Sequence, residues 1–535
     1  MISDIEIAQR ARPVLISEIA RPIGIRSDEM IPHGNFAAKV LPSLLERFTS
    51  KPNGKLILVT SITPTKYGEG KTSTAIGLTQ AFGKLKKRVM LCLREPSLGP
   101  MFGVKGGACG GGYSQVIPMD DINLHFTEDN YAIAAANNLL CAMLDSHIYF
   151  KNRLKIDPHE IHIRRAYEIS DRTLRRLHFK VTDKFSYESG FDISAASETM
   201  AILALCKDLR DLELRLRNML VAFNTDGKPV TVKHLNAEGA MGALLKYAIM
   251  PNLVQTIEGQ PVLVHCGPFA NIAHGANSLI STRMALKLAN YVITESGFGA
   301  DLGAEKFFDI VCRQGGLKAD LAVVVVSARA IKVHGLDNLS SHINIIKRFG
   351  VVPIVAINRF AGDSQKDIQL IERHCEGLGV EYNSSDAVAK GGQGAVALAE
   401  KCVQSLQKKP SDFKFLYDAK TPVKEKIETI ATQIYGAEGV SFSRKASAEL
   451  KRIKDLGLDE LPVNIAKTQF SLSDNPKLKG APKGWRLKIK EIRIFAGAGF
   501  IVPIAGDIML MPGLPEKPAA CNIEIDGEGK IKGLF

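Results

Sequence analysis

The sequence contains no long hydrophobic run. Its most apolar strand-like stretch, residues 321–327, is far shorter than the roughly 18 residues that a membrane-spanning helix needs. The first residues also lack the basic and then apolar pattern of a secretory signal, because they carry the acids Asp4 and Glu6. We therefore expect a cytoplasmic protein with no membrane partner.

Paired cysteines and low-complexity segments are missing as well. The nine cysteines are odd in number and contain no C-x-x-C spacing, which fits neither a disulfide framework nor a structural zinc site. We therefore expect the cysteines to be reduced thiols. Hydrophobic residues make up 45% of the chain and charged residues 23%, an ordinary globular balance. At roughly 150 residues per domain, 535 residues predict about three or four compact units.

The charge is unbalanced but not concentrated. There are 69 basic and 56 acidic residues, so the net charge is +13. Such an excess can steer anionic partners to the surface. Because the sequence has no arginine-rich tract and no basic patch interleaved with aromatic residues, we expect no nucleic-acid partner. Solubility, phosphates or a glutamate-tailed substrate account for the charge equally well.

Short apolar runs alternate with helix-like segments through the first two-thirds of the chain. Residues 55–62 predict a buried strand, residues 72–85 a helix after a glycine-rich loop, and residues 88–93 a second strand. Further strands are predicted at residues 261–265, 291–294, 321–327, 351–358 and 487–495. We predict an α/β fold: a P-loop NTPase-like parallel-sheet domain over residues 1–350, followed by two smaller α/β or α+β domains over residues 351–455 and 456–535.

Leucines recur at helical spacing from Leu205 to Leu220, with charged residues between them. This stripe is typical of an amphipathic helix whose charges form a solvated face. We therefore predict a helix over residues 205–220.

Residues 63–72 end in Gly-Lys-Thr, as a phosphate-binding P-loop does, although Thr65 stands where the standard pattern has its first glycine. Since the loop joins a predicted strand to a predicted helix, backbone N–H groups and the positive end of the helix should converge there. Lys71 is then expected to reach the terminal phosphates, and the Thr72 hydroxyl to bind magnesium. The predicted nucleotide-binding residues are Thr65, Lys66, Tyr67, Gly68, Glu69, Gly70, Lys71 and Thr72.

A second signal follows the second strand. Arg94 should lie at the carboxyl end of that strand, beside the crevice where α/β sheets bind ligands. A planar guanidinium at this place matches a carboxylate or an acyl phosphate in bidentate fashion. Residues 103–113 are rich in glycine, which costs backbone entropy and indicates a close approach of the backbone to a ligand.

Together these segments resemble the formate–tetrahydrofolate ligase family. The motifs are T-P-T-x-x-G-E-G-K-T at residues 63–72, R-E-P-S-L-G-P at residues 94–100, and the glycine run with S-Q-V-I-P-M-D-D-I-N-L-H-F at residues 114–126. Further segments that resemble the family lie at residues 190–203, 267–275, 297–307, 356–360, 389–392, 504–513 and 533–535. The resemblance therefore covers essentially the whole chain.

The resemblance implies ATP-dependent ligation of formate to tetrahydrofolate through formyl phosphate, giving 10-formyltetrahydrofolate, ADP and phosphate. It implies formyl phosphate contact by Arg94, pterin stacking on Phe360 and a family histidine at His265. It also implies Mg2+, stimulation by a monovalent cation (K+ or NH4+) and a homotetramer. The predicted catalytic residues are Lys71, Arg94, Asp129 and His265, of which the last two are alternatives for collecting the proton after acyl transfer.

Three positions depart from the family pattern. Val388 stands where the family usually has a tryptophan in the folate wall, and the only tryptophan of the chain is Trp485. Tyr131 replaces an expected histidine, and His33 begins a segment that differs from the family's Tyr-Gly-Lys-Tyr pattern. Two alternatives thus stay open: another P-loop carboxylate ligase or ATPase with a different acceptor, and a non-catalytic scaffold that binds nucleotide or RNA.

Overall fold

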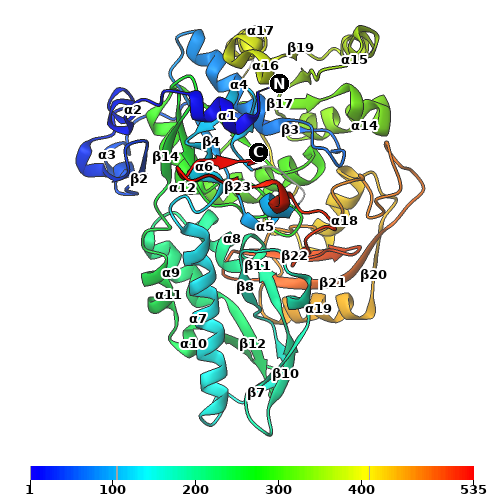
Figure 1. Cartoon of the computed structure of the whole chain (residues 1–535). Coiled ribbons are helices and arrows are strands. Elements are labelled where there is room, and N and C mark those ends of the chain that lie inside the picture. The colour runs from blue at the N-terminus through cyan, green and yellow to red at the C-terminus, as the bar shows by residue number, and fades with distance from the viewer. Residues whose placement is uncertain (1, 104–106, 409, 535) are drawn as a thin grey trace.

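A large, mostly parallel sheet organises the molecule and confirms the predicted α/β fold (Figure 1). The computed structural model describes residues 2–103, 107–408 and 410–534. In spatial order the central strands are β1 (Met30–His33), β2 (Ala37–Val40), β14 (Asn252–Thr256), β15 (Pro261–Val264), β4 (Val89–Leu93), β16 (Tyr291–Glu295), β3 (Lys55–Ser61), β17 (Leu321–Val326), β18 (Pro353–Asn358) and β19 (Tyr382–Ser385). From β15 to β19 every neighbouring pair is parallel.

Both faces of this sheet are covered, which explains why its strands are continuously apolar rather than alternating. On β3, Ile57 and Val59 belong to one buried cluster, whereas Leu56 and Leu58 belong to the other. The helices that flank the sheet are α4 (Lys71–Lys84), α12 (Leu279–Leu288), α14 (Ala328–Arg348), α15 (Gln365–Gly377) and α17 (Val396–Lys408). The order β3, loop, α4, β4 is the predicted one.

A second group of elements lies below the sheet in Figure 1. It contains α7 (Asp129–Tyr149), β7 (Ile156–Ile161), β8 (Arg165–Tyr167), β9 (Leu177–Lys180), β10 (Ser186–Ser189), β11 (Phe191–Ile193), α8 (Glu198–Leu205), α9 (Leu209–Asn218), β12 (Leu220–Asn224), β13 (Pro229–Thr231), α10 (Val232–Leu235) and α11 (Glu238–Leu244). The single helix predicted over residues 205–220 is wrong at both ends. Asp208 caps a new helix by accepting the N–H of Asp211, Leu205 ends α8, and Leu220 starts β12.

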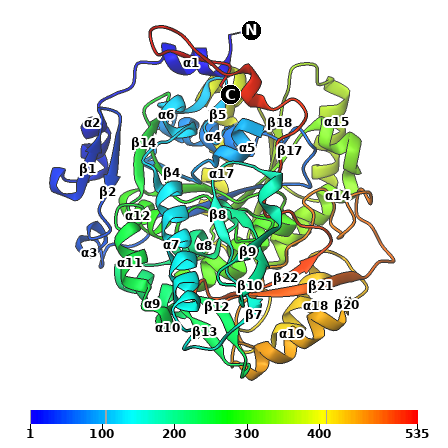
Figure 2. The ribbon, with the colours of Figure 1, turned by 60° about the horizontal axis from the view of Figure 1, so that its bottom comes forward.

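Residues 423–505 contribute a small sheet and two helices, seen together in Figure 2. They are α18 (Val423–Gln433), β20 (Val440–Phe442), α19 (Arg444–Asp455), β21 (Leu487–Phe495) and β22 (Phe500–Ala505). The chain ends near its beginning, because Gln9 Nε2 donates to the carbonyl of Ile531 at 2.9 Å. The division at residues 350 and 455 stays a prediction, and β17 and β18 pair in parallel across residue 350.

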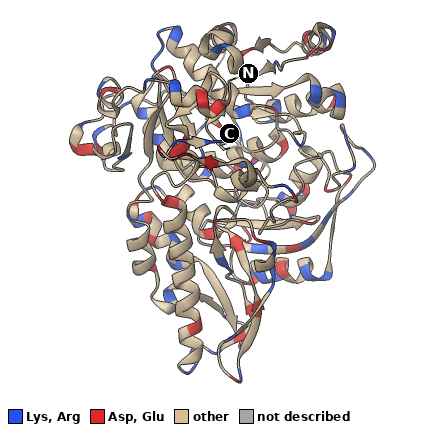
Figure 3. Cartoon of the chain, viewed as in Figure 1, with Lys and Arg blue, Asp and Glu red and all other residues tan. Residues whose placement is uncertain are grey.

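Lysine and arginine are interspersed with aspartate and glutamate over the elements of the chain (Figure 3). All nine cysteines are free, and only Cys521 is exposed. Over residues 2–103, 107–408 and 410–534, no helix combines the length and apolar character that a bilayer crossing requires.

Candidate functional site

Most of the predicted site residues follow the carboxyl ends of parallel strands, where open α/β sheets bind ligands. The phosphate-binding loop joins β3 to α4. The other residues that follow or end neighbouring strands are Arg94 after β4, His265 after β15, Glu295 at the end of β16, Ser327 after β17, Phe360 after β18, and Val388 after β19.

The loop itself has the backbone shape that its glycines permit. Gly68 and Gly70 adopt left-handed conformations with φ of 75° and 74°. A Cβ atom at Gly70 would lie 2.3 Å from Nδ2 of Asn358, which donates to the carbonyl of Glu69 at 3.0 Å. Since glycine has no side chain to cap α4, the first N–H groups of that helix stay available for phosphate oxygens.

Glu69 points into the protein rather than towards a ligand. Its Oε1 accepts the N–H of Thr65 at 2.7 Å, and its Oε2 accepts the hydroxyl of Ser327. Lys66 and Tyr67 form the outer rim of the loop, and Tyr67 is 72% exposed. Glu69 therefore closes the loop on itself, and a carboxylate facing inwards avoids repelling phosphate.

Lys71 lies at the start of α4 and reaches across the site. Its Nζ donates to the carbonyl of Phe298 at 2.7 Å, in the loop after β16. The same carbonyl accepts the hydroxyl of Ser61 at 3.0 Å. Phe298 has a φ of 61°, an uncommon conformation for a residue other than glycine that persists where its surroundings hold it.

Thr72, Glu295 and Arg94 come together beside the loop. The Thr72 hydroxyl donates to Oε2 of Glu295 at 2.8 Å, and Arg94 Nη2 lies 3.7 Å from the other carboxylate oxygen. A hydroxyl and a carboxylate are hard oxygen donors of the kind that Mg2+ takes in addition to water and substrate phosphates. Within the described ranges no three His, Cys, Asp or Glu side chains gather as a metal site.

Arg94 retains hydrogen-bonding capacity. Nη1 donates weakly to the carbonyl of Pro268 at 3.5 Å, while Nε is buried without a partner among the described residues. An unpaired guanidinium donor beside Glu295 is a feature that a carboxylate or acyl phosphate could satisfy in bidentate fashion.

Asp129 begins α7 behind the Arg94 loop and is 2% exposed. Lys39 donates to it at 2.7 Å, Asn252 at 2.9 Å and Thr127 at 3.2 Å. Burial raises the pKa of the Asp129 carboxyl, while these three partners oppose the rise. The side chain is thus held in a closed internal network.

His265 lies in the core rather than at the crevice. It is fully buried, and its ring nitrogens lie 2.6 Å from the Ser278 hydroxyl and 2.6 Å from the Ala248 carbonyl. Burial lowers the pKa of His265 to about 3, so the ring is neutral at pH 7. Both nitrogens are occupied by the protein, and the arrangement favours a structural histidine.

The two residues expected in the folate wall have different surroundings. The guanidinium of Arg329 lies 3.8 Å from the ring centroid of Phe360, a cation–π contact that occupies one face of the ring. Val388 is half-buried and packs on the glycine-rich run, where its carbonyl accepts the N–H of Tyr113 at 2.8 Å. Residues 104–106 of that run lie outside the described residues.

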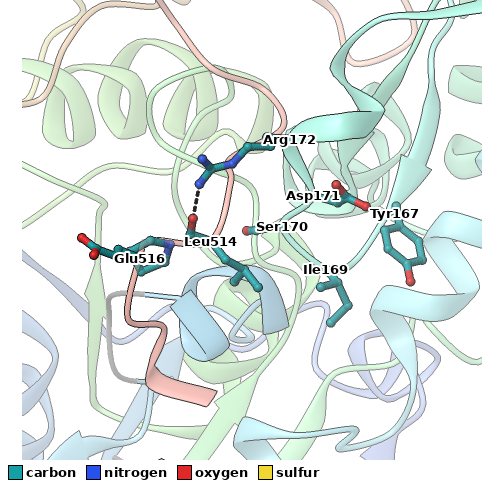
Figure 4. A pocket seen from close by; sticks show the side chains of 8 residues that line it. Tyr167, Ile169, Ser170, Asp171, Arg172, Leu514 and Glu516 are labelled. Carbon is teal, nitrogen blue, oxygen red and sulfur yellow. Dashed lines mark hydrogen bonds between the residues drawn. The ribbon is translucent and has the colours of Figure 1, made fainter. Parts of the chain in front are cut away.

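An open pocket of about 670 Å³ lies elsewhere, between residues 167–172 and the C-terminal segment 514–516. Figure 4 shows Arg172 reaching across it to the carbonyl of Leu514. Its described lining includes none of the predicted site residues, so the site is defined by the phosphate-binding loop rather than by this cavity.

Glu295, Phe298 and Asn358 were not predicted as site residues. Glu295 directly follows the predicted strand 291–294, and an acid at the end of a buried strand is the available signal. Asn358 likewise ends a predicted strand. Phe298 contributes only its carbonyl, for which the side-chain sequence carries no signal.

The match to a known protein family extends over nearly the whole chain. The family model described as formate–tetrahydrofolate ligase matches residues 2–535. Among solved structures, the translation elongation factor SelB from Methanococcus maripaludis in complex with GPPNHP matches at 18% identity and a TM-score of 0.18, over 25% of this chain and 29% of that chain. The MinC:MinD cell division protein complex from Aquifex aeolicus matches at 13% identity and a TM-score of 0.27, over 66% of this chain and 96% of that chain. The family match shows that the chain belongs to the formate–tetrahydrofolate ligase family of ATP-dependent carbon–nitrogen ligases.

Proposed function

We propose that the chain ligates formate to tetrahydrofolate with ATP, giving 10-formyltetrahydrofolate, ADP and phosphate through formyl phosphate. The observation that carries the proposal is the convergence of Thr72 at the start of α4, Glu295 at the end of β16 and Arg94 after β4. Family membership supports the overall reaction, and the site residues supply a role for each half of it.

The first half is phosphoryl transfer. A formate oxygen forms a bond to the γ-phosphorus while the bond from that phosphorus to the ADP oxygen breaks. Amides of the loop and the Lys71 ammonium neutralise the charge on the phosphate oxygens. The Thr72 hydroxyl and the Glu295 carboxylate would hold a magnesium ion, which would supply further charge neutralisation.

The second half is acyl transfer. The folate aryl amine is neutral at pH 7, so it attacks the formyl carbon without prior deprotonation. The carbon–oxygen bond to phosphate breaks, and the departing phosphate takes the amine proton. Arg94 holds the formyl phosphate during this step. We assign no proton transfer to His265 or Asp129, because both ring nitrogens of His265 and both carboxylate oxygens of Asp129 hydrogen-bond within the protein.

The folate end of the site is proposed to include Phe360 and Val388, one ring face of Phe360 being free of Arg329. Cytoplasmic location, a homotetramer and stimulation by K+ or NH4+ are proposed from the family resemblance. The packing of Val388 on the glycine run favours, as a second candidate, a ligase with the same first half and another acceptor.

The test is ATP turnover with formate and tetrahydrofolate each omitted in turn, with ADP and formylated folate measured separately. Arg94→Gln should keep ATP binding and lose formyl transfer, whereas Arg217→Gln, which changes a surface arginine on α9, should behave as the wild type. ADP release that needs formate but yields no formylated folate favours the other acceptor. ADP release that ignores formate contradicts the proposal.

A further inference from the structure

A buried histidine on α14 contacts two loops of the site. One is the phosphate-binding loop, and the other is the loop after β16, residues 296–299, here called the Phe298 loop, whose carbonyl accepts the Lys71 ammonium. His342 is fully buried. Its Nε2 lies 2.9 Å from the backbone nitrogen of Thr63 and 3.0 Å from the Thr63 hydroxyl, at the start of the phosphate-binding loop. Its Nδ1 accepts the N–H of Ala300 at 3.2 Å, immediately after the Phe298 loop. One side chain thus touches both walls of the site.

Both ring nitrogens of His342 are engaged by the protein. The Ala300 N–H points at Nδ1 and the Thr63 N–H points at Nε2, which also lies 3.0 Å from the Thr63 hydroxyl. The Thr63 N–H also lies 3.2 Å from Oδ1 of Asn338. Burial lowers the pKa of His342 to about 4, in keeping with a neutral ring.

The ring also limits the path of the Phe298 loop. A Cβ atom at Gly299 would lie 2.8 Å from Cε1 of His342 and 2.6 Å from Oδ1 of Asp301. The loop therefore turns directly against the imidazole. Next to it, Phe298 holds its left-handed conformation and directs its carbonyl at Lys71.

We propose that His342 is a positioning residue for phosphoryl transfer, acting through Lys71. The path runs from His342 Nδ1 to the Ala300 N–H, through Gly299 to the Phe298 carbonyl, and from that carbonyl to Lys71 Nζ. His342 does not touch the substrate; it determines where the carbonyl that orients the lysine stands. The inference rests on the proposed function of the site.

The expected effect falls on turnover rather than on binding. Misplacing a reacting group by about 1 Å can cost on the order of 100-fold in rate. The loop amides and the amino-terminal end of α4 can still bind ATP without the imidazole. For His342→Ala we expect kcat to fall about 10- to 100-fold while KM for ATP changes by less than about threefold.

Two conservative variants separate the two contacts of the ring. Asparagine places an accepting oxygen near the position of Nδ1 and can keep the Ala300 contact. Glutamine places a donor near the position of Nε2 and can keep the Thr63 contact. Because the proposed path runs through Ala300, His342→Asn should retain more of the wild-type kcat than His342→Gln. Equal losses, or better retention by glutamine, overturn the proposal.

A double-mutant cycle tests whether the effect passes through Lys71. Adding His342→Ala to Lys71→Ala should cost little further activity in single-turnover ADP formation, whereas independent roles would multiply. His374→Ala is the matched control, since Nε2 of His374 on α15 lies 2.8 Å from the Ser340 hydroxyl of α14. It should keep the wild-type kcat.

Melting temperatures complete the test. If His342→Asn and His342→Gln melt lower than the wild type but keep its kcat, the residue is only structural and the inference fails. If the wild type itself forms no ADP in response to formate, the proposed function fails and the inference fails with it. The two failures are thus distinguished by the wild-type measurement alone.

Discussion

Replacing Glu295 by glutamine tests the inferred magnesium site most directly. The residue is 2% exposed, accepts the Thr72 hydroxyl at 2.8 Å and lies 3.7 Å from Arg94. Glutamine has the same shape and still accepts the Thr72 hydrogen bond, so packing is retained. It lacks the negative charge that a hard cation prefers.

The size of the effect follows from the contact that is lost. A hydrogen bond or ligand contact to a charged group contributes about 1.5–3 kcal/mol, which is about 10- to 100-fold in a binding constant. We expect the Mg2+ concentration for half-maximal formate-dependent ATP turnover to rise by about this factor in Glu295→Gln. Turnover at saturating Mg2+ should recover in part, because Thr72 and the phosphates still bind the ion.

The assay is ADP release titrated with magnesium chloride at fixed ATP and formate. Glu198→Gln is the matched control: Glu198 is also buried, and it accepts the N–H groups of Gly497 and Ala498 at 2.8 and 3.2 Å, far from the loop in sequence. It should keep the wild-type magnesium midpoint. An unchanged midpoint in Glu295→Gln would refute the assignment of Glu295 to the metal.

Lys71→Ala should lower formate-dependent ADP release by at least about 100-fold with little change in melting temperature, and wild-type turnover in this variant would remove the phosphate-binding assignment. Val388 packs so closely on Gly112 that a Cβ atom there would lie 2.8 Å from its Cγ1. Val388→Trp should therefore lower the free energy of unfolding in urea by about 1–3 kcal/mol and leave KM for tetrahydrofolate unimproved; a lower KM with intact stability would instead support an aromatic folate wall. Burial raises the pKa of Glu198 to about 8, so the folded state keeps a proton that the unfolded chain loses near pH 4.5, and stability falls as the pH rises between these values. Glu198→Gln should remove that fall when urea unfolding is compared at about pH 5 and about pH 8, and an equal pH dependence in both proteins would contradict the raised pKa.

Local sequence was sufficient to predict the elements that form the site. The apolar run before residue 63, the glycines of the loop and the helical spacing after Thr72 predicted β3, the loop and α4, because each depends on contacts between residues close in the chain. Local pattern failed where a side chain starts a new helix: the leucine stripe continues past Asp208, but the cap at that residue separates α8 from α9. Arg94 could be placed at this edge of the sheet because β4 is the next strand after the loop and α4.

Tertiary structure alone decided which residues face one another. Thr72 and Glu295 are 223 positions apart, and they meet because β16 inserts between β4 and β3, an order that long-range packing selects. The same packing buries His265 and turns Glu69 inwards, although both have residue types typical of catalytic sites. The contact of Lys71 with the Phe298 carbonyl is equally invisible in the sequence, since every residue has such a carbonyl and only the fold determines where it points.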